Sequence, residues 1–213
     1  MGYTTDFSGN FKLSRKLTEK EKEYINTFSD TRRMKRDVNK LMKLYDGKFG
    51  YPFPELLSGL VMNNTAETIY GNEGEYFAKN DGNSGQIDDG TIIDYNQPAG
   101  QMSFSGTEDF NKRWAENQKR IKEGKCQPGL WCQWIVVSYD DGDYLEWDGG
   151  EKFYEYIAWL KYMIEHFFSK WGVILNGEVE WIGEDPNDRG KIIVTDNVVK
   201  VQRGVIEYID SDE

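Results

Sequence analysis

The chain has 213 residues, of which 38% are hydrophobic and 15% aromatic, so it can bury a packed core. Its formal net charge of −11 at pH 7 disfavours direct binding to nucleic acid or to anionic lipid. Two cysteines and one histidine exclude a Cys/His zinc cluster supplied by this chain alone, and we expect neither a metal nor another cofactor.

The expected compartment follows from two sequence features. No apolar run approaches the length of a membrane span, and the N-terminus lacks the charged-then-apolar pattern of a secretion signal. We therefore expect a cytoplasmic protein with free thiols and no membrane contact.

Charge alternates in sign along the chain. Residues 1–49 hold 12 basic and 7 acidic side chains, residues 50–110 hold 1 and 10, residues 111–138 hold 6 and 2, and residues 139–213 hold 7 and 18. The acidic character is therefore concentrated in the C-terminal half, where it favours a cationic partner.

The N-terminal region predicts a strand followed by helices. Hydrophobic alternation over residues 2–16 predicts the strand. Thr18 and Glu21 have capping-box spacing at the start of a helix over residues 17–28. After the sequence FSDT we expect a second helix that ends at Gly47. Its apolar positions have helical spacing: Met34, Val38, Leu41, Met42 and Tyr45.

Residues 48–128 are rich in Gly, Asn and Asp and poor in aliphatic residues. They predict mostly loop, with one short strand at residues 91–95 and one basic helix at residues 107–125. Because this region shows no core of its own, we interpret it as a long insertion into a single domain that spans residues 1–213.

The C-terminal part has the clearest pattern. Residues 130–139 and 144–147 predict a hairpin with Gly142 in its turn. Asp148 and Glu151 have capping-box spacing at the start of an amphipathic helix that runs to Gly172. Three more strands are expected over residues 177–184, 190–194 and 198–209.

The fold class expected from this order is α+β. A β-α-β-β-α-β core of the ferredoxin-like type would carry additional C-terminal antiparallel strands. On the strand at 130–139, one set of alternate residues would pack under the helix. The other set would be covered by the insertion or would bind a partner.

Several stretches, once read in order, resemble a known family. YTTDFSG and TRRMKRD near the start, QPGLWCQW and LEWDGGEKFY in the middle, and NGEVEWIGED near the end carry the resemblance over most of the chain. The chain resembles an uncharacterised family of short proteins encoded by bacteria, phages and plasmids. The resemblance implies a phage or mobile-element context and carries over no catalytic residue. Residues 50–66 and 99–126 are additional relative to the compact members.

Three candidate sites have ordinary structural explanations that we favour. Residues 80–91 partly match a calcium-binding loop, but two strong ligands are missing, so a polar turn is the favoured interpretation. His166 lies near a helix C-terminus, where a protonated imidazole is favourable, and lacks a catalytic partner motif. Cys132 is expected in the core and Cys126 at the surface beside lysines.

A basic cluster is the first candidate for a binding patch. It consists of Arg32, Arg33, Lys35 and Arg36. Arginines suit phosphate or carboxylate recognition, but the favoured interpretation is a solvated helix face that pairs with the acidic half of the chain.

Carboxylates beside aromatic residues are the second candidate. They could hold a cationic partner or perform acid–base chemistry, although capping and core packing account for several of them. The set is Asp94, Tyr95, Trp131, Trp134, Glu146, Trp147, Asp148, Glu151, Glu180 and Trp181.

The leading functional hypothesis is a non-enzymatic acidic binding protein of phage or mobile-element type, which occupies a host protein and inhibits it. The motivating features are the net charge and the absence of a common catalytic motif. One alternative is a protein that binds or sequesters a nucleotide-like small molecule through Arg32, Arg33 and the faces of Trp131 or Trp134. Another is a carboxylate-based hydrolase.

Overall fold

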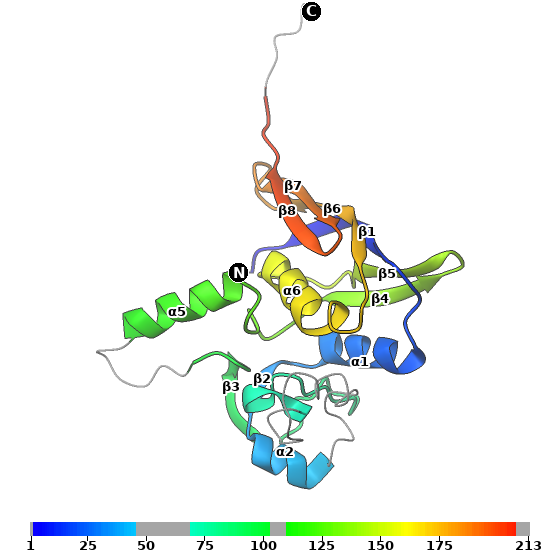
Figure 1. The fold of residues 1–213 in the computed structure, drawn as a ribbon. Helices are drawn as coiled ribbons and strands as arrows, with labels where there is room; N and C mark the ends of the chain where they lie inside the picture. The colour runs from blue at the N-terminus through cyan, green and yellow to red at the C-terminus, as the bar shows by residue number, and fades with distance from the viewer. Residues whose placement is uncertain (1, 46–68, 103–109, 208–213) are drawn as a thin grey trace, which may run out of the picture.

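The computed structural model describes residues 2–45, 69–102 and 110–207. Helices and strands alternate irregularly along the chain (Figure 1). In order they are β1 (Thr5–Leu13), α1 (Glu19–Asp30), β2 (Met34–Arg36), α2 (Val38–Tyr45), the 3₁₀ turn η1 (Asn72–Gly74), β3 (Ile92–Pro98), α5 (Phe110–Lys122), β4 (Trp134–Tyr139), β5 (Gly142–Trp147), α6 (Tyr156–Met163), the π-helical turn η2 (Ile164–Phe168), β6 (Leu175–Gly183), β7 (Arg189–Thr195) and β8 (Val198–Arg203).

The main sheet has six strands in the order β4-β5-β1-β6-β7-β8, and every neighbouring pair is antiparallel. A separate two-stranded sheet joins β2 to β3. The expected α+β class is therefore confirmed. The hairpin and the three C-terminal strands form in the predicted order, but the first hairpin strand begins at Trp134 and not at residue 130, and the last strand ends at Arg203.

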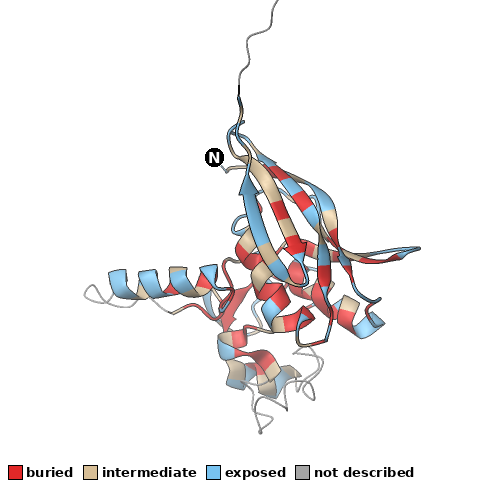
Figure 2. Cartoon of the chain, turned by 45° about the horizontal axis from the view of Figure 1, so that its top comes forward, coloured by how far each residue is buried: buried red, intermediate tan, exposed pale blue. Residues whose placement is uncertain are grey.

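The core lies between one face of the six-stranded sheet and the helices α1 and α6 (Figures 1 and 2). Alternate residues of the strands face it, as the two-residue period of a strand requires. Phe11 on β1, Trp134 on β4 and Val179 on β6 are among the buried residues. At the end of α6, the wider turn η2 places both Phe167 and Phe168 in this core.

A second layer packs on the other side of α1 from the sheet (Figure 1). It consists of β2, α2 and residues 69–102. Leu41, Tyr70 and Phe77 form a small apolar cluster there, separate from the main core. The inserted region thus contributes to a core that it shares with α2.

Two local predictions are wrong. Met34 does not begin a helix, because residues 34–36 form β2 and the helix starts at Val38. The predicted end at Gly47 lies outside the described residues. Asp148 and Glu151 do not cap a helix: Asp148 Oδ1 accepts a hydrogen bond from the Gly150 N–H, and α6 begins at Tyr156. The predicted capping box of Thr18 and Glu21 is confirmed.

Among residues 2–45, 69–102 and 110–207, no helix has both the length and the apolar character that crossing a bilayer requires.

Candidate functional site

The second layer is built around cationic side chains that the fold buries. Arg33, Lys35 and Arg36 on or beside β2 are only 2%, 1% and 1% exposed. A buried charge is stable only when hydrogen bonds or opposite charges surround it. The predicted solvated helix face is therefore wrong, and the partners of these cations define the local structure.

Arg33 is held by backbone carbonyls. Its guanidinium donates to the carbonyls of Gly74, Glu75 and Phe77, and its Nε donates to Gln127 Oε1. Burial lowers the Arg33 pKa to about 10, which leaves the group charged at neutral pH. The cation thereby fixes the course of residues 74–77 around its planar fork.

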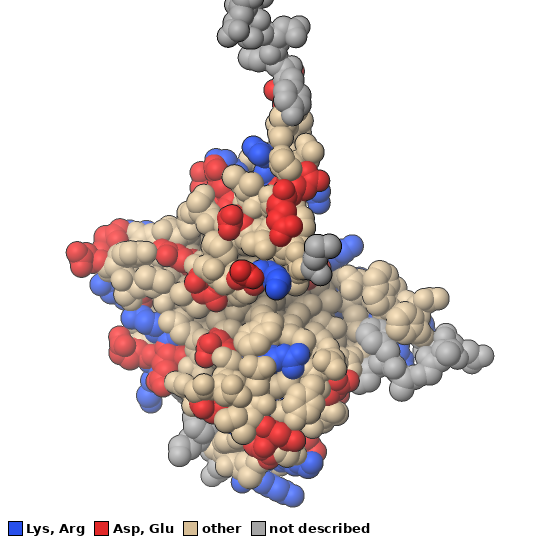
Figure 3. Space-filling model, turned by 180° about the vertical axis from the view of Figure 1, so that it is seen from behind, with Lys and Arg blue, Asp and Glu red and all other residues tan. Residues whose placement is uncertain are grey.

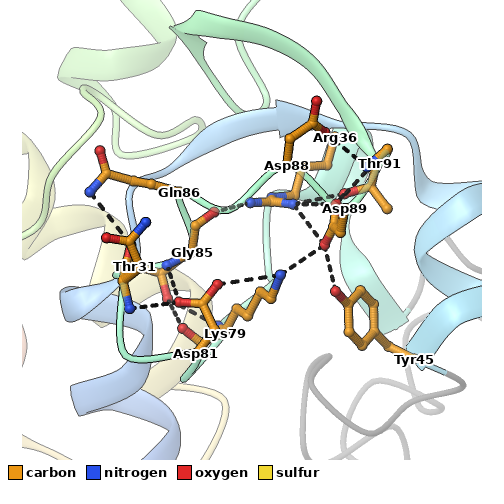
Figure 4. Close-up of polar contacts among 12 residues, drawn as sticks. Thr31, Arg36, Tyr45, Lys79, Asp81, Gly85, Gln86, Asp88, Asp89 and Thr91 are labelled. Carbon is orange, nitrogen blue, oxygen red and sulfur yellow. Dashed lines mark hydrogen bonds and ion pairs between the residues drawn. The ribbon is translucent and has the colours of Figure 1, made fainter.

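Arg36 and Lys79 share a carboxylate (Figure 4). Asp89 lies 3.2 Å from Arg36 Nη1 and 3.0 Å from Lys79 Nζ. Burial alone would raise the Asp89 pKa, but hydrogen bonds from Thr91, Tyr45 and Lys79 outweigh it and hold that pKa well below its usual range. Asp89 is therefore ionised and cross-links β2 to the loop that precedes β3.

The same loop contains the partial calcium motif. Asp81 accepts hydrogen bonds from the N–H groups of Asn83 and Gly85, and its Oδ2 lies 3.4 Å from Lys79 Nζ. Cationic side chains thus neutralise the loop carboxylates where a metal ion would otherwise do so. Within residues 2–45, 69–102 and 110–207, no group of three or more His, Cys, Asp and Glu side chains could hold a metal ion.

Glu75 is a buried acid beside the fork of Arg33. Burial raises the Glu75 pKa to about 7. Its carboxyl packs against Gly100, where an added Cβ would lie 3.0 Å from Oε1. Oε1 has no hydrogen-bond partner among the described residues. Nothing in the sequence marks this acid, since its neighbours come from segments far away along the chain.

His166 is neutral. Its Nε2 lies 3.0 Å from the Gly124 carbonyl, which can only accept, so Nε2 carries the proton. Nδ1 then accepts from the Tyr76 hydroxyl at 3.2 Å. Burial lowers the His166 pKa to about 4. His166 therefore does not carry the positive charge that would be favourable near the end of a helix.

The two thiols are both buried. Cys132 lies in the core as predicted, whereas Cys126 packs with Ile121 and Ala158 and does not reach the surface. Burial raises the pKa of Cys126 to about 11 and that of Cys132 to about 12. Both thiols are consequently poor nucleophiles near neutral pH.

Helix α5 has two different sides and projects from the rest of the molecule (Figures 1 and 2). Asn117 and Ile121 are its buried residues. Phe110 and Trp114 are 47% and 52% exposed and lie one turn apart. The helix and the residue after it line a shallow groove of about 510 Å³, whose members are Trp114, Ala115, Gln118, Lys119, Lys122 and Glu123. This surface combines exposed aromatic area with lysines.

The predicted binding residues do not form one surface. Arg32 and Tyr95 do meet, since Arg32 Nη1 donates to the Tyr95 carbonyl at 2.6 Å. Trp131 is 39% exposed, but Trp134 is buried among the aromatic residues of the core. Trp131 and Trp134 thus cannot act together as faces of one ligand site.

The predicted acidic residues are also dispersed. Asp94 is exposed on β3, while Asp148 and Glu151 lie in the segment between β5 and α6. Partial burial raises the Asp148 pKa. Arg33 and Arg36 are enclosed in the second layer, as described above. Across the face seen in Figure 3, acidic side chains alternate with lysines and arginines.

Comparisons with protein-family models, with curated proteins and with solved structures found no match to this chain.

Proposed function

We propose that the chain is a non-enzymatic binding protein of the cytosol, which acts by occupying a host protein, and that helix α5 is its contact element. One observation carries this proposal: Phe110 and Trp114 are both about half exposed on a helix that projects from the molecule. Large aromatic side chains on a rigid, protruding element are the typical anchors of protein interfaces.

The partner chemistry follows from the surroundings of Trp114. Lys119 and Lys122 are exposed on α5 and line the groove with Trp114, together with Glu123. A complementary surface would offer an apolar cleft with an acidic rim. Nucleic acid is disfavoured as the partner because the whole chain carries a net charge of −11.

This surface differs from the one expected from the sequence. The acidic and aromatic set includes buried residues such as Trp134, whereas Trp114 was not part of it. A binding surface made of carboxylates alone would need to be uninterrupted by cations. Lys191 bridges Glu178 and Glu180 at 3.3 and 2.8 Å, so we favour α5 as the contact element.

The proposed biological context rests on the resemblance to short proteins of bacteria, phages and plasmids. We also propose that β1, α1, β4, β5, α6 and β6 form a ferredoxin-like unit. The antiparallel order β4-β5-β1-β6 within the larger sheet supports this assignment.

The test begins with crosslinking of the tagged full-length protein in a bacterial host, followed by purification of the captured protein and a direct titration. Trp114→Ala should weaken the titrated affinity about tenfold or more, as truncation of an aromatic anchor does. Tyr139→Ala is the matched control, because Tyr139 is similarly exposed but lies on the β4–β5 hairpin.

Equal effects of the two variants would contradict the assignment to α5. Binding of a short DNA duplex with the same dependence on Trp114 would replace a protein partner with nucleic acid.

A further inference from the structure

The two edge strands of the six-stranded sheet differ in what their outer backbone groups contact. At β4, Asn26 of α1 donates to the Val136 carbonyl and accepts from the Val136 N–H, and Ser29 donates to the Trp134 carbonyl. At β8, no hydrogen bond among the described residues reaches the outer edge. One edge of the sheet is therefore closed by a helix, and the other is open to another strand.

The β7–β8 hairpin determines which backbone groups lie on this open edge. Its two-residue turn, 196–197, has φ of 49° and 66°, the type I′ geometry, so the flanking Thr195 and Val198 form a hydrogen-bonded pair. Bonded and non-bonded pairs then alternate along the ladder, in agreement with the hydrogen bond from the Gly204 N–H to the Arg189 carbonyl at its other end. Three residues of β8 consequently direct their N–H and C=O groups away from β7: Val199, Val201 and Arg203.

The side chains of β8 favour pairing with an acidic strand. Val198 and Val201 are 58% and 41% exposed, and β8 contains neither proline nor glycine. Lys200 and Arg203 are also exposed, and neither forms an ion pair with another described residue. Because opposite charges on facing strands stabilise a sheet, these two cations favour a partner strand that places carboxylates opposite them.

The sequence after β8 has this character. Residues 204–207 continue from β8 away from the sheet (Figure 1), and Val205 is 88% exposed. By sequence, residues 205–213, VIEYIDSDE, combine apolar side chains with four carboxylates. We call residues 204–212 the C-terminal arm. Because it leads away from its own sheet, the arm is directed toward a second molecule.

A second copy of the chain, laid antiparallel along β8, has one register that matches its arm to this edge. The opposed pairs are Arg203 with Glu207, Lys200 with Asp210, and Val201 with Ile209. All three pairs join positions that are both odd or both even, so the outward backbone groups of the two copies face each other.

The neighbouring registers lose this match. A shift of two residues in either direction places Arg203 opposite Val205 or Ile209 and not opposite a carboxylate. Direct pairing of β8 with β8 about Val201 would place the two Lys200 side chains diagonally on one face. Charge thus favours exchange of the arms.

We propose that two copies of this chain associate by exchanging their C-terminal arms. Residues 198–212 of each copy form an antiparallel ribbon about a twofold axis at Val205, and each arm adds a strand to the open edge of the other copy's sheet. The ribbon covers the exposed valines of β8 and neutralises both of its cations.

The first test is the mass of the full-length protein by light scattering at about 100 μM. The expected mass is near twice the 24.8 kDa of the chain. Val205→Cys should form a disulfide between copies on mild oxidation, because Cα atoms of a hydrogen-bonded antiparallel pair lie about 5.5 Å apart. Val201→Cys is the matched control, since position 201 would meet itself only if β8 paired directly with β8. The native thiols are buried and should not interfere.

The second test reverses one charge pair. Lys200→Glu should weaken self-association about tenfold or more, because each dimer contains the pair with Asp210 twice. Adding Asp210→Lys should restore it. Adding Asp212→Lys makes the same change of charge two positions further along and should leave the weakening in place. Sedimentation equilibrium measures the affinity, and thermal unfolding verifies that each variant folds.

Three results would overturn the proposal: a monomer at about 100 μM, crosslinking through position 201 in place of 205, or equal restoration by Asp210→Lys and Asp212→Lys. The outcome is separable from the partner-binding proposal, because Trp114→Ala should leave the dimer intact.

Discussion

The guanidinium carbon of Arg33 lies 4.1 Å from the centre of the Phe28 ring, so that a buried cation of the second layer stacks on an aromatic residue of α1. This contact joins the two layers. The ring attracts the charge through its π face, and the carbonyls of residues 74–77 take up the N–H groups.

Replacing Arg33 tests how far the fold depends on this cation. Arg33→Lys keeps the charge but cannot donate to several carbonyls in one plane, and we expect a loss of about 2–4 kcal/mol in the free energy of unfolding. Urea unfolding measures it. Arg32→Lys is the control, because Arg32 is partly exposed. This variant should lose only about 0.5 kcal/mol in the free energy of unfolding. Equal losses would show that the buried fork is dispensable.

Gly100 tests the close approach of Glu75. Gly100 and Gly90 have nearly the same backbone angle, with φ of 75° and 76°, so alanine is strained similarly at both. An added Cβ would meet the Glu75 carboxyl at Gly100 and nothing within 4 Å at Gly90. We expect Gly100→Ala to destabilise the protein by about 1–2 kcal/mol more than Gly90→Ala in thermal or urea unfolding. Indistinguishable variants would rule out this contact.

Glu75 and His166 give opposite dependences of stability on pH. Folding raises the Glu75 pKa from 4.5 to about 7. The contribution of Glu75 to the free energy of unfolding is therefore full below pH 4.5 and declines as the pH rises to 7. Folding lowers the His166 pKa from 6.5 to about 4, so its contribution is full above 6.5 and declines as the pH falls to 4.

The two contributions offset each other between about pH 5 and 6.5. Relative to the unmodified protein, Glu75→Gln should make the free energy of unfolding rise more steeply with pH in this window. His166→Gln should make it fall with pH. Urea unfolding at a series of pH values compares the three proteins, and parallel curves would contradict the assigned protonation states.

The thiols should be protected in the folded protein. Since Cys126 and Cys132 are buried and their pKa values are raised, a thiol reagent at pH 8 should label neither until the protein is unfolded in urea. Measuring the absorbance of the released thiolate with and without urea tests this. Rapid labelling of one thiol without urea would place it at the surface.

Most of the main sheet and the helices that cover it can be predicted from the sequence, because their apolar residues recur with the period of a strand or a helix. Residues 177–184 alternate between apolar and polar side chains, and Thr18 carries a local capping signal that depends on Glu21 alone. Such patterns act over a few residues and survive tertiary packing.

The second layer could not be predicted in the same way. In TRRMKRD the charged residues indicate a surface helix. Yet Glu73 lies 38 positions after Lys35, the accepting carbonyl of Phe77 lies 44 positions after Arg33, and Asp89 lies 53 positions after Arg36. Periodicity contains no information about such pairs. The candidate contact surface on α5 was missed for a related reason, since the exposure of Trp114 depends on how distant segments pack.

The dependence of β2 on residues 69–102 limits how this protein can be shortened. A chain from which that segment was deleted would keep Arg33, Lys35 and Arg36 but lose Glu73, Asp89 and the accepting carbonyls. A chimeric protein that received residues 69–102 from another chain would therefore fold only if it also received the matching β2, because each segment supplies the charge partners of the other.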